Sequence, residues 1–179
     1  MADGDARREA WERLSAWMAT LRDLDGVQQL LGWDQETLMP LAGAEGRAHR
    51  SGTVAALYHR ELVRPDVEEI IAALEEDPDL APERRAMLRI ARRERRRALA
   101  LPEDLVRAET ELTARCTMVW REARDGDDFA AFARAFAPLL DVQREIAAAT
   151  ADGGEPYDAL LDRYEPGARA RDLEPLFAD

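Results

Sequence analysis

The chain has 179 residues, 46% of them hydrophobic and 35% charged, which is typical of one globular domain large enough to bury a core without disulfides. A net charge of −12 argues against general nucleic-acid binding, and no apolar run is long enough to cross a bilayer. The single cysteine, Cys116, excludes an internal disulfide framework, and the N-terminus lacks the apolar segment of a secretory signal, so we expect a cytoplasmic protein.

Helical periodicity begins near the N-terminus. Apolar residues recur at three- and four-residue steps over roughly residues 5–25, which predicts an amphipathic helix. Asp25-Gly26 is expected to loosen this helix. Residues 27–36 are expected to be helical again, and Pro40 to end the segment.

The rest of the chain shows the same pattern, and turn residues divide it. Pro138 lies inside one expected helix and should kink or restart it. The further helices are expected over 44–63, from Arg64-Pro65-Asp66 to the break at 77–79, from Pro82 to about Leu99, from 101–103 to about Arg124, from Asp128 to the break at 152–154, from Pro156 to Arg163, and from Arg169 to Asp179.

The predicted class is therefore all-α, an extended lobe of about seven to nine helices with no sheet, because no useful β-type alternation appears. Leu173, Leu176 and Phe177 look like the first turns of an amphipathic helix, and the sequence stops two residues later without a cap. We therefore expect the 179 residues to be a piece of a longer protein.

Several enzyme classes lack their residues in this sequence. There is no lysine, which excludes a phosphate-loop lysine and a Schiff base. Serine occurs only at Ser15 and Ser51, and neither stands in a Gly-x-Ser-x-Gly setting.

His49 and His59 are the only imidazoles. They are ten residues apart on one predicted helix, so they are separated by roughly 15 Å along its axis, too far to share a metal. There is no His-Glu-x-x-His. We expect each histidine to be a surface or interhelical residue, and Cys116 to be a buried, inert thiol.

Two further segments allow alternative interpretations. The run Arg92–Arg97 could be a basic patch, but on an acidic protein a solvated helix face paired with acidic neighbours is favoured. In Trp33-Asp34-Gln35-Glu36-Thr37, the two carboxylates are two residues apart and point to different sides of a helix, which suits catalysis poorly. We favour a structural role, in which Asp34 and Gln35 satisfy nearby donors and Trp33 anchors in the core.

Three segments together resemble the Taq-type metallocarboxypeptidase family (thermostable carboxypeptidase Taq). They occur in the family's order and span nearly the whole chain. They are Leu31-Gly32-Trp33-Asp34-Gln35-Glu36-Thr37 with Met39-Pro40, Ala44-Glu45 and Arg47; Trp120-x-x-Ala123-Arg124 with Asp128-Phe129 and Phe132; and Pro156-Tyr157-Asp158-Ala159-Leu160-Leu161-Asp162-Arg163-Tyr164-Glu165-Pro166-Gly167.

The resemblance implies a helical, usually dimeric enzyme that removes C-terminal amino acids from peptides. In such enzymes, zinc or cobalt is held by the two histidines of His-Glu-x-x-His and a downstream Glu, and the Glu of the motif is the general base. The N-terminal helices form a wall or lid of the substrate groove.

Residues 1–179 match only the N-terminal part, roughly a third, of such an enzyme, so the catalytic part is absent from this sequence. We assign no catalytic, cofactor-binding or metal-binding residue, and expect this chain alone to be inactive and to bind no catalytic zinc. Its expected partners are the missing C-terminal part, a peptide substrate for the full-length enzyme, and a second copy in a homodimer. The alternatives are a stand-alone helical interaction module derived from the lobe, and an unrelated acidic helical bundle.

Overall fold

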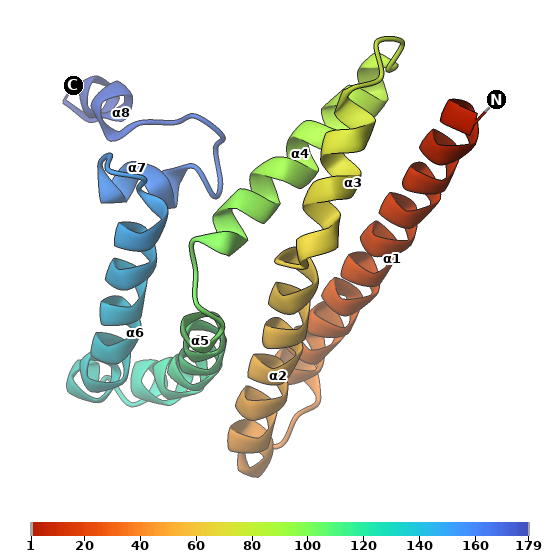
Figure 1. The fold of residues 1–179 in the computed structure, drawn as a ribbon. Helices are drawn as coiled ribbons and strands as arrows, with labels where there is room; N and C mark the ends of the chain where they lie inside the picture. Colours follow the sequence, from red (N-terminus) through yellow and green to blue (C-terminus); the bar gives the residue numbers. More distant parts are fainter. Residues whose placement is uncertain (1, 179) are drawn as a thin grey trace.

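The computed structural model describes residues 2–178, and this part of the chain contains α-helices and no strand, which confirms the all-α prediction (Figure 1). A one-turn 3-10 helix, Leu41–Gly43, follows the first helix. The helices are α1 (Ala2–Thr37), α2 (Ala44–Leu62), α3 (Pro65–Glu75), α4 (Pro82–Leu99), α5 (Glu103–Asp125), α6 (Phe129–Thr150), α7 (Pro156–Leu161) and α8 (Ala170–Phe177).

Local sequence sets the starts of four helices. Pro65, Pro82 and Pro156 occupy the first helical position of α3, α4 and α7, where a missing N–H costs little and the fixed φ suits the helix. Asp128 caps α6, because its carboxylate accepts the Ala131 N–H at 2.9 Å.

The first helix does not loosen at Asp25-Gly26, so that prediction was wrong. α1 runs without interruption to Thr37. Glycine in a helix interior destabilises the helix by about 1 kcal/mol relative to alanine. Tertiary contacts of α1 before and after Gly26 offset this penalty. Trp17 Nε1 donates to the Glu61 carbonyl at 2.8 Å, and Gln28 Nε2 donates to the Ser51 carbonyl at 3.2 Å.

One other boundary differs from the prediction, because α7 ends at Leu161, two residues before the expected Arg163. α6 continues through Pro138, so it does not restart there, and a kink at Pro138 stays a prediction. Pro138 is exposed, so the backbone carbonyl that loses its intrahelical donor there can be hydrated.

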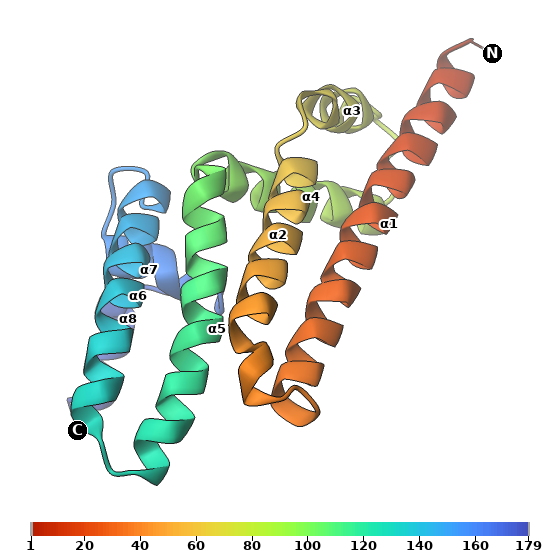
Figure 2. The same cartoon turned by 90° about the horizontal axis from the view of Figure 1, so that it is seen from below.

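The helices α1, α2, α5 and α6 lie side by side in one layer, with neighbours antiparallel (Figure 2). α3 and α4 cross one end of this layer (Figures 1 and 2). α7 and α8 follow α6 in the chain and lie behind the layer in the view of Figure 2. Within residues 2–178, no helix is both long enough and apolar enough to span a lipid bilayer.

The main hydrophobic core lies where α1, α3, α4 and the end of α2 meet. The apolar stripe of α3, formed by Val67, Ile70, Ile71 and Leu74, is entirely buried there, which contributes about 1.5–3 kcal/mol for each large side chain. The buried cluster contains Leu14, Trp17, Leu62, Val67, Ile70, Ile71, Leu74, Leu80, Leu88, Ala91 and Ala98.

The large apolar side chains of α6 are only partly buried. Phe129 is 76% exposed, whereas Ile146, near the other end of the helix, is buried. Phe129 and Phe132 lie 6.1 Å apart between ring centroids, and Phe132 stacks on Phe136 at 5.3 Å. α6 therefore presents an aromatic stripe, defined as these three phenylalanines. Other described residues cover it only in part, since Phe132 is half-buried and Phe136 is 38% exposed.

Candidate functional site

The segment that ends α1 is held by an arginine of α2. Arg47 donates from Nη1 to the Leu31 carbonyl at 3.0 Å, and from Nη2 to the Asp34 carboxylate. Its side chain is only 14% exposed. The prediction that Asp34 satisfies a nearby donor is confirmed, and Arg47 is the residue that supplies it.

Glu36 faces a different helix. Its carboxylate accepts from Arg121 of α5, whose other terminal nitrogen lies 3.5 Å from the Gln35 carbonyl. Asp34 and Glu36 thus point to α2 and α5 respectively, as their spacing predicts. The two carboxylates are already engaged by separate cations, which suits the favoured structural role and not an acid–base pair.

Trp33 does not anchor in the core, and that part of the prediction was wrong. The side chain is 55% exposed, although its carbonyl accepts the Thr37 hydroxyl at 2.7 Å. A tryptophan one position before Asp34 must face about 100° away from it on the helix. Because Asp34 faces α2, Trp33 is turned toward solvent.

The two histidines have different environments. His49 is largely exposed, with Nδ1 3.9 Å from the Glu111 carboxylate, whereas His59 is buried, with 6% of its surface exposed. Burial lowers the pKa of His59, and Glu103 opposes this shift. His59 forms no hydrogen bond through its ring with any described residue.

Cys116 is buried on α5, as predicted. Burial raises the pKa of its thiol, so the reactive thiolate is disfavoured. This side chain is a small apolar packing residue and no nucleophile is indicated.

The arginine run on α4 does pair with acidic neighbours. Arg92 lies 2.9 Å from Glu75, and Arg93 lies 2.9 Å from Asp162. Arg95 corrects the prediction of a wholly solvated face, because it is 4% exposed and donates to the Leu62 carbonyl at 2.6 Å. The stem of Arg95 faces the core at a position where the periodicity of α4 requires an inward side chain.

The third matching segment folds into a turn stabilised by its own aspartates. Asp162 accepts the Gly167 N–H at 2.8 Å, and Asp158 accepts the Ala170 N–H at 2.7 Å. The Gly167 N–H and then Arg93 lower the pKa of Asp162. Gly167 has φ +87°, a conformation that favours glycine.

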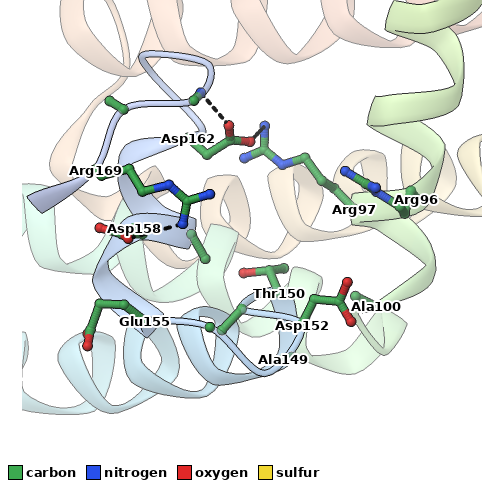
Figure 3. Close-up of a pocket in the computed structure, with 15 residues that line it drawn as sticks. Arg96, Arg97, Ala100, Ala149, Thr150, Asp152, Glu155, Asp158, Asp162 and Arg169 are labelled. Carbon is green, nitrogen blue, oxygen red and sulfur yellow. Dashed lines mark hydrogen bonds and ion pairs between the residues drawn. The ribbon is translucent and has the colours of Figure 1, made fainter.

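A cavity of about 400 Å³ lies between α4, the end of α6, α7 and the turn after it. Figure 3 shows Arg96 and Arg97 at one side, Arg169 opposite them, and Thr150 and Asp152 below. Sequence analysis missed this site, because no periodicity links α4 to a turn more than fifty residues later. The run Arg92–Arg97 was the one available signal.

A metal site requires several donors close together, and the described residues do not supply them. No group of three or more His, Cys, Asp or Glu residues among positions 2–178 is arranged to hold a metal ion. The donor set of this part of the chain therefore does not fit the zinc or cobalt that the resemblance implies for a full-length enzyme, and no chemical step is derived through a metal.

Comparison with known proteins gives consistent matches. The profile of the family described as Carboxypeptidase Taq (M32) metallopeptidase matches residues 13–179. Thermostable carboxypeptidase 1 of Thermus thermophilus is 34% identical over 182 residues, covering 95% of this chain and 36% of that protein. Thermostable carboxypeptidase 1 of Pyrococcus furiosus is 34% identical over 151 residues, covering 84% of this chain and 30% of that protein.

Solved structures show the same helical arrangement. The crystal structure of BsuCP superposes with a TM-score of 0.89 at 24% identity, and a structure of the Pyrococcus furiosus carboxypeptidase with 0.75 at 31% identity. Each match covers 95% of this chain and 34% of the other. The chain thus spans about a third of the proteins it matches.

Proposed function

Because the chain belongs to the carboxypeptidase Taq (M32) metallopeptidase family, we propose that it is the N-terminal helical lobe of a metal-dependent carboxypeptidase. The match over residues 13–179 carries this proposal. The lobe would form a wall or lid of a substrate groove, and the complete enzyme would release C-terminal amino acids from peptides.

The chain by itself should have no peptidase activity. The sequence contains no His-Glu-x-x-His, and its two histidines lie on one helix with different environments. The catalytic metal, zinc or cobalt, and its general base would come from the part of the enzyme that these residues do not include. That catalytic part is the partner we propose, and a cytoplasmic setting is supported by the single buried cysteine.

A peptidase assay tests the claim of inactivity. The purified 179-residue chain is incubated with an N-blocked dipeptide and added zinc or cobalt. We expect no release of the C-terminal amino acid above the rate without protein. Turnover that depends on the metal and is lost with a chelator would overturn the claim.

A chimeric enzyme tests the role of the lobe. Residues 13–179 replace the matching N-terminal region of the Thermus thermophilus relative, and the chimera is assayed on the same substrate. We expect measurable metal-dependent activity, because the substituted lobe supplies the same wall. A folded chimera with no activity, beside an active parent enzyme, would count against the proposal.

A stand-alone interaction module derived from the lobe is the second candidate, supported by the exposed aromatic stripe on α6. The DNA downstream of codon 179 discriminates between the two. A continuing frame that encodes His-Glu-x-x-His would support the enzyme lobe, and a stop codon with no such frame after it would support the module.

A further inference from the structure

The cavity between α4 and α7 contains charges of both signs that the fold does not neutralise. Arg96 forms no ion pair or hydrogen bond with any described residue, and neither does Asp152. Both line the cavity without forming an ion pair with each other. The Arg96 guanidinium can therefore bind a negative group of a ligand, and the Asp152 carboxylate can bind a positive group of the same ligand.

Three arginines, Arg96, Arg97 and Arg169, line the cavity together with four carboxylates, Asp152, Glu155, Asp158 and Asp162. Arg97 reaches Glu94 and Asp162 only at 3.9 and 4.0 Å, and Arg169 lies 3.4 Å from Asp158. These are loose contacts, so their guanidinium groups retain donors for a further acceptor. Figure 3 shows Arg96, Arg97 and Arg169 around the space, with the Thr150 side chain below it.

The four carboxylates disfavour a simple anion in this cavity, and the unpaired Arg96 disfavours a simple cation beside Asp152. A molecule that carries a carboxylate and an ammonium group close together matches both. The cavity volume of about 400 Å³ lies within the range usual for small-molecule sites.

A second compartment, with both apolar and charged lining, adjoins the first. A second cavity of about 330 Å³ shares Arg97 and Thr150 with the first. Its other lining residues include the apolar side chains of Leu62, Leu101 and Ile146. The charged side chains of Glu94, Glu109 and Arg163 line it as well. A ligand held at the arginines can therefore extend an apolar group toward these side chains.

We propose that this cleft binds a free α-amino acid with an apolar side chain. Its carboxylate contacts Arg96 and Arg97, its ammonium group faces Asp152, and its side chain enters the compartment formed by Leu62, Leu101 and Ile146. If the proposed function holds, such a molecule is also the product released by the complete enzyme, and only this physiological source of the ligand rests on that function.

Binding is measured on the 179-residue chain by isothermal titration and amide chemical shifts, with L-leucine as the probe at neutral pH. We expect one saturable site for L-leucine, with N-acetyl-L-leucine and L-leucinamide each binding about tenfold more weakly, because each has lost one charge. Glycine should also bind more weakly, because it has no side chain to contact Leu62, Leu101 and Ile146.

Two variants separate the charged contacts. Arg96→Gln should weaken binding of L-leucine about tenfold. Asp152→Asn should weaken L-leucine but not N-acetyl-L-leucine, which has no ammonium group. Arg89→Gln is the matched control, because Arg89 is an exposed arginine on the same helix that does not line either cavity. Circular dichroism verifies that each variant keeps its helix content.

The proposal is overturned if L-leucine shows no saturable binding, if N-acetyl-L-leucine binds equally well, or if Arg96→Gln binds like Arg89→Gln. None of these measurements requires peptidase activity. An inactive chimera with intact amino-acid binding would count against the proposed function and leave this site in place.

Discussion

Two arginines, Arg47 of α2 and Arg121 of α5, bind the C-terminal end of α1. Arg47 satisfies the Leu31 carbonyl and the Asp34 carboxylate together, so one side chain from α2 fixes both the backbone and a side chain of α1. Charge-assisted hydrogen bonds of this kind are stronger than neutral ones and cost more when one partner is removed. Asp34 is therefore explained by this contact between α1 and α2, which we call the clamp, whereas the exposed Trp33 takes no part in it.

Arg47→Ala should lower the free energy of unfolding by about 1–3 kcal/mol, because it leaves a partly buried carbonyl and carboxylate without their donor. Urea denaturation measures this change. Arg50→Ala, on the same helix, is the control, since Arg50 is exposed and its loss should change stability by at most about 0.5 kcal/mol. Equal effects of the two substitutions would contradict the clamp.

His59 should make stability depend on pH. Its pKa in the folded chain lies below the ordinary 6.5 because of burial, so the unfolded chain binds a proton at a higher pH. The contribution of neutral His59 is fully present above about pH 6.5 and is lost as the pH falls from there through the folded-state pKa.

Chemical denaturation from pH 8 to pH 5 measures this effect. His59→Gln should flatten the decline in unfolding free energy below pH 6.5, because glutamine does not titrate. His49→Gln is the control at a largely exposed imidazole. A wild-type profile with the same slope as His59→Gln would show that His59 is not responsible.

The close approach of α2 and α5 depends on small residues of α2. α2 presents Ala48, Gly52 and Ala56 at four-residue spacing, all buried. A Cβ at Gly52 would lie 2.7 Å from Glu111 Cγ and 3.1 Å from Arg107 Cγ, on α5. The crossing of α2 and α5 therefore requires glycine at this position, whereas Gly26 in α1 has open space around it.

Two identical substitutions test this difference. Gly26→Ala should stabilise the protein by about 0.5–1 kcal/mol, because alanine favours the helix and meets nothing within 4 Å. Gly52→Ala should be destabilising by about 1–3 kcal/mol, because α5 must shift away from the added Cβ. Thermal and urea unfolding measure both, and equal stabilisation by the two substitutions would refute the close approach.

For the whole molecule, the distribution of apolar surface is uneven. The core at the α1, α3 and α4 end is well buried, whereas α6 exposes an aromatic stripe and α8 exposes Phe177. Large exposed apolar patches mark interaction sites in soluble proteins. In a lobe of a larger enzyme, the catalytic part would cover it, and in the isolated chain a second copy can take its place.

We therefore expect concentration-dependent self-association of the 179-residue chain, detected by analytical ultracentrifugation. Replacing Phe129 and Phe136 together by Ser should weaken it while leaving helix content unchanged, because both side chains are exposed. Ile90→Ser removes an exposed apolar side chain from α4 and is the control. A wild-type chain that stays monomeric at high concentration would contradict this expectation.

The sequence by itself determined the helical class and most helix boundaries, because proline starts, the Asp128 cap and the 3.6-residue apolar period are local properties. It also identified the family through three segments. It could not determine the continuity of α1, the exposure of Trp33, the burial of Arg95, or the cavity that joins α4 to the turn after α7. Those features depend on contacts between residues far apart in the chain, such as Arg93 with Asp162 and Trp17 with Glu61. Only the packing of one helix on another decides which side of each faces protein and which faces water.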